Sequence, residues 1–242
     1  MFSRSAALLV SVILSAGCAG QLDSSLLASA GQDLLLAAIL SDAQVKSLSS
    51  QAAAHYDEQK RVAPGNDPYS QRLDRLMGGH RNAEGLDLNY KVYLADEINA
   101  FAMADGTIRV YSGLMDRMDD HELFFVIGHE VGHVKLGHSK EKMRVAYSAT
   151  AARKGVAAVG GAVGGIARSQ IGAFAEHVVN AQFSQREELE ADDFGLKFMK
   201  RNRYPQRAAV SALSKLGGGG SSFLSSHPDP ETRAKRLERS VK

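Results

Sequence analysis

The chain has 242 residues, with 29 Lys and Arg against 27 Asp and Glu, and a formal net charge of +2. It contains no block of basic residues, so the composition argues against a nucleic-acid-binding protein. Cys18 is its single cysteine, which excludes a disulfide-stapled fold and a metal site built from thiolates. The length suffices for one domain with a substantial core.

Residues 1–17 have the pattern of a secretory signal peptide. Their apolar run ends at Leu14 and is far shorter than the roughly 20 residues of a membrane-spanning helix. The small residues before Cys18 look like a lipobox, although Ser15 stands where leucine is usual. We therefore predict a lipid anchor on Cys18; the alternative is ordinary signal cleavage that leaves the protein unanchored. Ala19 resembles the residue found after the cysteine in lipoproteins sent to the outer membrane.

The next segment, residues 18–62, is predicted to be a tether followed by helices, with a break near residues 41–42. A single domain is then predicted over residues 63–242. It opens with Asp67 as a helix N-cap and Pro68 at the first helical position, a pairing typical of helix starts. This helix is expected to end at a glycine pair about ten residues later.

Three strands are predicted next, over residues 89–94, 98–104 and 107–112. Asp105 and Gly106 indicate a hairpin turn between the second and third strands. An exposed edge on the strand at 107–112 could pair with an extended peptide through main-chain hydrogen bonds. The alternative is that this segment is an ordinary buried strand.

The most informative motif is H-E-x-x-H, formed by His129, Glu130 and His133 within a helical pattern. Asp119 and Glu122 form a capping-box variant at the start of that helix. Residues four apart share one helical face, so both imidazoles can reach one zinc ion while the glutamate lies beside a zinc-bound water. The alternative is that two helix histidines have this spacing by chance.

Other residues of the same helix indicate how it packs. Gly128 and Gly132 lower helix stability, and their lack of side chains suggests that another element packs closely against them. His138 would point about 180° away from His129 if the helix extended that far. It is therefore not expected to be a ligand.

A catalytic zinc ion needs a third protein ligand, and an acidic segment downstream offers one. Glu188 and Asp192 are also four apart on one helical face. Glu188 can complete a His2Glu set, and Asp192 can accept the free N–H of a ligating imidazole. Glu187, Glu190 and Asp193 are expected to face solvent. The alternative is that the whole acidic cluster is surface charge.

Together these motifs resemble a known family. H-E-x-x-H followed by E-x-x-A-D at 188–192 is similar to the metallopeptidase family, family forty-eight, that includes HtpX and the CAAX-prenyl endopeptidase. Residues 99–102 and 106–114 look like that family's strand segment, and the likeness extends from about Tyr90 to the end of the chain. It is greatest for the periplasmic lipoprotein branch. The resemblance implies one zinc ion held by His129, His133 and Glu188, with Glu130 as catalytic base and Asp192 as supporting residue.

Three later segments are less specific. Residues 155–172 are rich in Gly and Ala and predict a pliable helical pair or lid, and residues 217–222 predict a flexible linker. A basic helix is expected over 231–239. His227 resembles a histidine-proline pair near the C-terminus of family members, which predicts a residue that gates the zinc or assists the transition state. The alternative is an ordinary loop histidine.

The expected fold is α+β, a mainly helical zincin-like (gluzincin) domain with a small three-stranded sheet beside the H-E-x-x-H helix. The resemblance implies an endopeptidase that acts on misfolded or unassembled envelope proteins, in the periplasm of a Gram-negative bacterium, anchored to the outer membrane through Cys18. Envelope assembly factors or other proteases are possible partners. One alternative is a chaperone-like outer-membrane assembly factor with low or regulated peptidase activity, and another is a zinc-free structural lipoprotein.

Overall fold

The computed structural model describes residues 40–153, 170–217 and 222–241. The predicted signal peptide, the Cys18 anchor and almost all of the glycine-rich segment at 155–172 lie outside the described residues. Within the described ranges, no helix is long and apolar enough to cross a membrane.

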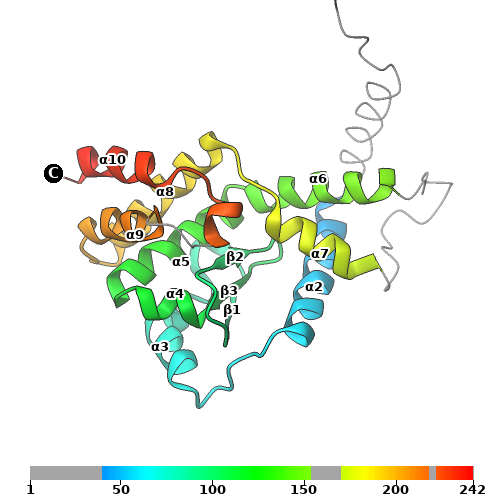
Figure 1. The fold of residues 1–242 in the computed structure, drawn as a ribbon, viewed down its shortest axis with the longest axis horizontal. Helices are drawn as coiled ribbons and strands as arrows, with labels where there is room; N and C mark the ends of the chain where they lie inside the picture. Colours follow the sequence, from blue (N-terminus) through cyan, green and yellow to red (C-terminus); the bar gives the residue numbers. More distant parts are fainter. Residues whose placement is uncertain (1–39, 154–169, 218–221, 242) are drawn as a thin grey trace, which may run out of the picture.

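The described part of the chain is mainly helical, with one small sheet at its centre (Figure 1). This confirms the predicted fold class. In chain order the elements are α2 (Asp42–Gln59), α3 (Pro68–Met77), η1 (Gly78–His80), η2 (Ala83–Gly85), β1 (Asn89–Tyr93), β2 (Ala100–Ala102), β3 (Thr107–Tyr111), α4 (Ser112–Arg117), α5 (Asp120–Lys135), α6 (His138–Arg153), α7 (Ile171–Asn180), α8 (Gln185–Arg201), α9 (Arg207–Gly217), η4 (Ser222–Ser225) and α10 (Pro230–Ser240).

Local sequence signals set several helix boundaries. Ser41 caps α2 and therefore accounts for the predicted break at this point. The side chain of Asp67 accepts a hydrogen bond from the Tyr69 backbone N–H at the start of α3, with Pro68 at the first position, as predicted. Asp119 caps α5 and forms the predicted capping box with Glu122.

The sheet has the order β1-β3-β2. β2 and β3 form the predicted hairpin, and β1 pairs with the other side of β3 in parallel, with Asn89 opposite Thr107. β3 is therefore the central strand, and all five of its residues are buried. The predicted exposed edge at 107–112 is wrong, because β1 occupies the side of β3 that the hairpin leaves free. The alternative prediction, that this segment is an ordinary buried strand, is confirmed.

Helices α5 and α8 pack closely side by side, and glycines make this possible. A Cβ atom on Gly132 would lie 3.1 Å from the Phe194 ring, and one on Gly195 would lie 3.0 Å from Phe125 and 3.3 Å from the backbone nitrogen of His129. A Cβ on Gly128 would similarly lie 3.1 Å from a ring carbon on α8. The prediction that another element packs against Gly128 and Gly132 is therefore confirmed.

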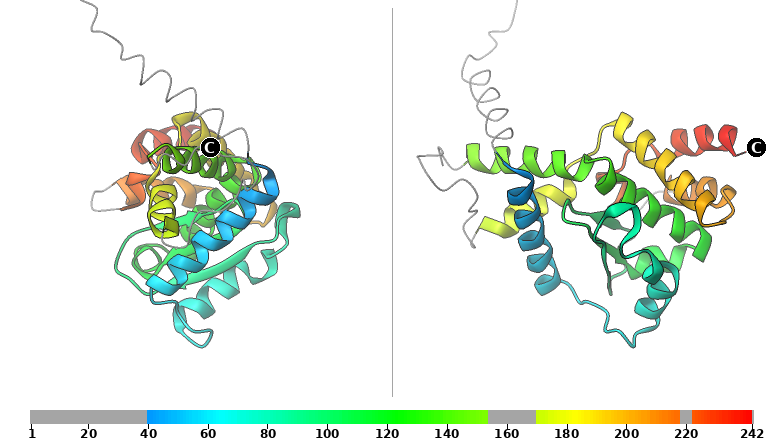
Figure 2. Two further views of the ribbon diagram at one scale, coloured as in Figure 1. Left: turned by 90° about the vertical axis from the view of Figure 1, so that its right-hand side faces the viewer. Right: turned by 180° about the vertical axis from the view of Figure 1, so that it is seen from behind.

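Two apolar cores lie on either side of the sheet region. The larger contains α5, α8, α9 and α10, and the smaller lies between the sheet and helices α2, α6 and α7 (Figure 2). Asp57 on α2 binds the buried Arg109 side chain of β3 through two oxygens, at 2.8 and 2.9 Å. Helix α2 is thus held to the sheet by both apolar contacts and a buried ion pair.

Candidate metal centre

Helices α5 and α8 bring the predicted site residues together in the interior. α5 carries the two histidines and the glutamate of the H-E-x-x-H motif, and α8 carries the two acidic residues. All five residues are at most 1% exposed: His129, Glu130, His133, Glu188 and Asp192. The close contact at the helix glycines is what allows side chains on two helices to meet here.

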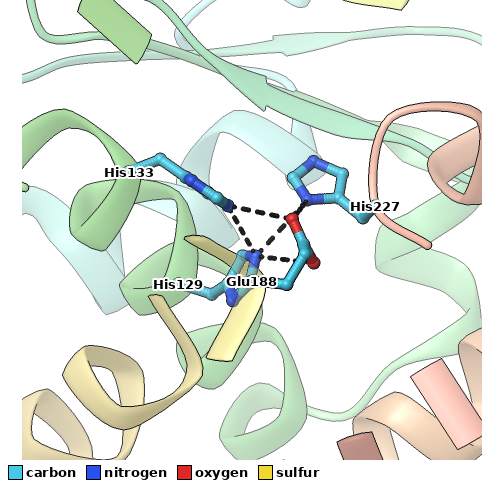
Figure 3. Close-up of side chains that lie close together, drawn as sticks. All are labelled: His129, His133, Glu188 and His227. Atoms are coloured by element: carbon cyan, nitrogen blue, oxygen red, sulfur yellow. Dashed lines mark hydrogen bonds and ion pairs between the residues drawn. The ribbon is translucent and has the colours of Figure 1, made fainter. Parts of the chain in front are cut away.

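Three of these side chains converge on one point (Figure 3). The Nε2 atoms of His129 and His133 are 3.0 Å apart. Glu188 places Oε1 3.3 Å from His133 Nε2 and Oε2 3.7 Å from His129 Nε2. Ligand atoms around a tetrahedral zinc ion are roughly 3.3 Å apart, given bond lengths near 2.0–2.1 Å. The spacing of these nitrogen and oxygen atoms therefore fits a single metal ion.

The carboxylate of Glu130 also indicates that the site receives a ligand. Among the described residues, neither of its buried oxygens has a hydrogen-bond partner. Burial and the neighbouring negative charge of Glu188 raise the pKa of Glu130 well above its usual value. A buried carboxylate without partners is costly, and a cation or a water beside it would reduce that cost.

His129 is fixed by a buried network. Its Nδ1 lies 3.0 Å from Asp192 Oδ1, and Arg233 binds the same carboxylate through Nε at 2.9 Å and Nη2 at 2.6 Å. Arg233 also forms an ion pair with Glu188. Burial by itself raises the pKa of Asp192, but the Arg233 guanidinium and His129 lower it to about 2. Asp192 is therefore ionised and able to accept the imidazole N–H.

The sequence-based prediction missed the role of Arg233, because it gave only a basic helix here and assigned no role to any of its residues. The helix is predicted correctly, but Arg233 is only 1% exposed. The signal was available: Arg233 and Leu237 are four apart, so they share a helical face, and Leu237 is fully buried. An arginine on the apolar face of an otherwise solvated helix indicates a buried acidic partner.

His227 lies inside the same cluster (Figure 3). Its Nδ1 is 2.9 Å from Glu188 Oε1, and its Nε2 is 3.4 Å from Glu130 Oε1. The ring stacks on Phe223, with centroids 3.9 Å apart, and it is 1% exposed. Burial, followed by the charge of His129, lowers its pKa well below the usual value. The His227 ring thus lies between the side chains of Glu188 and Glu130.

The flanking residues differ in part from expectation. Helix α5 ends before Gly137, whose φ of 83° is left-handed, and α6 begins at His138. The estimate that His138 points away from the site assumed a continuous helix. Instead, His138 lies 3.1 Å from His133, although it is not among the residues whose atoms converge on the metal position. Glu190 keeps 41% of its side chain exposed, yet it also contacts His138.

The remaining acidic residues of α8 have local roles. Glu187 forms a capping box with Ser184 at the start of the helix. Asp193 is 46% exposed and pairs with Arg236 on α10. Neither contacts the cluster.

A buried H-E-x-x-H helix with a glutamate from a second helix is typical of a metallopeptidase, and comparison with known families supports this class. Residues 70–241 match the family described as Peptidase family M48. The chain therefore belongs to peptidase family M48 and is a metalloendopeptidase.

Two relatives are similar over almost the whole chain, and a third is similar over part of it. Metalloprotease LoiP of Escherichia coli (strain K12) is 44% identical over 226 residues, which cover 91% of this chain and 89% of the relative. Metalloprotease YcaL of the same organism is 38% identical over 238 residues, covering 96% and 94%. The Beta-barrel assembly-enhancing protease of this strain is 26% identical over 195 residues, which cover 69% of this chain and 38% of that protein.

Proposed function

We propose that this metalloendopeptidase uses one zinc ion to hydrolyse peptide bonds in misfolded or unassembled proteins of the cell envelope. The observation that carries the proposal is the convergence of His129, His133 and Glu188 on one point, with Glu130 adjacent. Two imidazoles and a carboxylate are a ligand set that suits a catalytic zinc ion with one open position. The single cysteine, Cys18, lies far outside this set in the sequence.

In this proposal, the chain supplies the ligands, the base and their orientation. A zinc ion held by His129, His133 and Glu188 would act as a Lewis acid and bring the pKa of a bound water towards 7. Glu130 accepts the proton of the attacking water and passes it to the leaving amine. Asp192 holds the His129 ring through Nδ1, so that Nε2 faces the metal position.

Replacing Glu130 by Gln tests this assignment. The amide has the same shape but cannot accept the proton, so we expect peptide hydrolysis to fall by about 10²- to 10⁴-fold while zinc content is retained. Turnover of a quenched fluorescent peptide, together with metal analysis, measures both. Glu141→Gln, at a largely exposed position, is the matched control. Undiminished turnover in Glu130→Gln would remove Glu130 from the mechanism.

We propose further that His227 gates the site. The backbone N–H of Phe223 bonds to the Ile98 carbonyl at 3.1 Å, and that of Phe183 bonds to the Ser226 carbonyl at 3.0 Å. These bonds anchor the segment before His227, and the His227 ring lies 3.4 Å from the fully buried Glu130. A peptide can reach Glu130 only after His227 moves aside.

His227→Ala separates gating from transition-state assistance. If His227 is a gate, we expect kcat/KM for a short peptide to rise in this variant because the site opens more readily. A fall in kcat without a change in KM would instead assign His227 to the transition state and contradict the gate. Zinc content of both proteins, measured in parallel, controls for loss of the metal.

For location, we propose a periplasmic protein that is anchored to the outer membrane through a lipid on Cys18. The short apolar leader and the small residues before Cys18 support this. Radiolabelled palmitate should label the wild type and not Cys18→Ala. Equal labelling of both would exclude this anchor. The expected partners are unfolded envelope proteins, together with envelope assembly or protease partners.

The buried site also favours a second candidate function, a chaperone-like assembly factor whose peptidase activity is normally restrained. Access to Glu130 is blocked in this structure, as expected for an enzyme that acts only when opened. Complementation of a deletion strain distinguishes the two. Full rescue by Glu130→Gln would favour the assembly factor, and no rescue would favour the peptidase.

A further inference from the structure

The two histidines of the H-E-x-x-H motif are held by different partners. Asp192 lies against the outer ring nitrogen of His129. Within the part of the chain that the structure describes, no carboxylate contacts Nδ1 of His133, which lies 3.1 Å from Nδ1 of His138. His138 Nε2 lies in turn 3.1 Å from Oε2 of Glu190. His133 and His138 are both buried, whereas Glu190 extends to the surface.

The position of each proton in this chain of contacts follows from the chemistry. His133 must present a bare Nε2 to a metal ion, so its proton resides on Nδ1. That N–H can donate to His138 only if Nδ1 of His138 is bare, which places the His138 proton on Nε2. Glu190 is an acceptor when ionised and therefore suits that N–H. One arrangement of protons satisfies all three side chains.

The His133 ring is oriented by its stacking neighbour and by the contact of its Nδ1 with His138. Phe183 stacks on the ring at 3.7 Å and fixes its plane. Stacking does not prevent a 180° flip of the ring about its Cβ–Cγ bond, whereas a hydrogen bond to Nδ1 fixes which ring edge faces His138. The left-handed turn at Gly137 places His138 at the start of α6, back against α5. The contact thus joins α5, α6 and α8 beside the metal position.

We propose that His138 is a positioning residue for His133, with Glu190 as the terminal acceptor. The inference rests on the proposed metal site and extends it: His138 sets the tautomer and orientation of one ligand without touching the ion. Partners of this kind typically change metal affinity by about 10- to 100-fold when removed. The proposed acceptor of the His133 N–H is a ring nitrogen of His138, whereas the acceptor of the His129 N–H is the carboxylate of Asp192.

The test compares zinc affinity in the full chain by competition with a chromophoric chelator. His138→Leu removes the acceptor, and we expect its zinc Kd to rise about 10- to 100-fold. His138→Asn places an amide oxygen near the position of Nδ1 and should recover most of that affinity. His80→Leu, which removes a half-buried histidine that contacts Phe124 and Phe198, should leave the Kd unchanged.

Several outcomes would overturn the inference. His138→Leu with the zinc affinity of the wild type would do so, as would His138→Asn as weak as His138→Leu. If Glu188→Gln loses zinc in the same assay while His138→Leu does not, this inference fails and the proposed function stands. If the wild type binds no zinc, both fail.

A second measurement needs no variant of uncertain folding. Nitrogen-15 NMR of the histidine rings in the wild type reports which ring nitrogen carries each proton. We expect His133 to be protonated at Nδ1 and His138 at Nε2, in the zinc-loaded protein. A proton on Nδ1 of His138 would contradict the relay, because His138 could not then accept from His133.

Discussion

The guanidinium of Arg233 lies in the protein interior between two carboxylates, those of Asp192 and Glu188. It offers the fork geometry that suits a carboxylate, and Asp192 uses both oxygens to accept from it. This cation allows two acidic side chains to remain ionised at almost no exposure. The pKa of Glu188 is accordingly lowered, because His129, His133 and Arg233 together outweigh the effect of burial.

Replacing Arg233 by Met keeps much of the volume but removes the charge. We expect the free energy of unfolding to fall by about 3–5 kcal/mol, since Asp192 and Glu188 would be buried without their cation. Urea denaturation of the metal-free protein measures this. Arg236→Met on the same helix breaks a partly exposed pair with Asp193 and should cost about 1 kcal/mol or less. Equal losses in both variants would show that Arg233 has no special role.

At this scale the sequence predicted the core of the site but not its surroundings. Spacings of four predicted that His129 and His133 share one helical face and that Glu188 and Asp192 share another, because helical geometry is local. Arg233 and His138 depend on how distant elements meet and on a turn at Gly137. Local spacing does not predict which residue of a distant element a side chain contacts. The position of Arg233 on the apolar face of α10 nevertheless indicated a buried acidic partner.

At the scale of elements, Asp57 provides the polar contacts that join α2 to the sheet. Its carboxylate accepts from Arg109, from Lys91 at 2.7 Å and from the Tyr93 hydroxyl at 2.7 Å. Burial by itself raises the pKa of Asp57, but these hydrogen bonds lower it from its usual 3.8 to about 2. The ion pair with Arg109 is mostly enclosed, with 17% of the Asp57 side chain exposed.

This shift gives a pH dependence of defined sign. A carboxylate whose pKa is lower in the folded state stabilises the fold above pH 4, and the effect is lost as the pH falls towards 2. We expect Asp57 to contribute roughly 2 kcal/mol in this way. Asp57→Asn should therefore unfold more easily at neutral pH, and the difference from wild type should shrink between pH 4 and pH 2.

Urea midpoints at pH 7, 4, 3 and 2 measure this difference. Asp74→Asn, which changes a largely exposed carboxylate paired with Arg81, is the control and should follow the wild type. A constant gap between Asp57→Asn and wild type across the whole pH range would contradict the ionic role of Asp57.

The elements themselves were largely predictable. Capping residues and the hairpin turn at 105–106 gave the positions of α3, α5, β2 and β3. The order of the strands was not predictable, because the parallel pairing of β1 with β3 depends on the path between them. The boundary expected near residue 63 stays a prediction, and the family match begins at residue 70.

For the molecule as a whole, α5 and α8, which carry the candidate metal centre, contribute to the larger core, and the smaller core joins α2, α6 and α7 to the sheet. Helix α6 connects the two, since it starts at His138 and packs against α7. In the proposed mechanism, the segment that ends in His227 closes the site. The proposed metal ligands would then be in place before a substrate can enter, as expected for a peptidase whose activity is normally restrained.

The most direct measurement of the central claim is a crystal structure of the zinc-loaded protein with anomalous data at the zinc edge. The account predicts one peak about 2.0–2.2 Å from Nε2 of His129, Nε2 of His133 and a carboxylate oxygen of Glu188. An anomalous peak elsewhere, or a Glu188 carboxylate beyond coordinating distance from the ion, would contradict it.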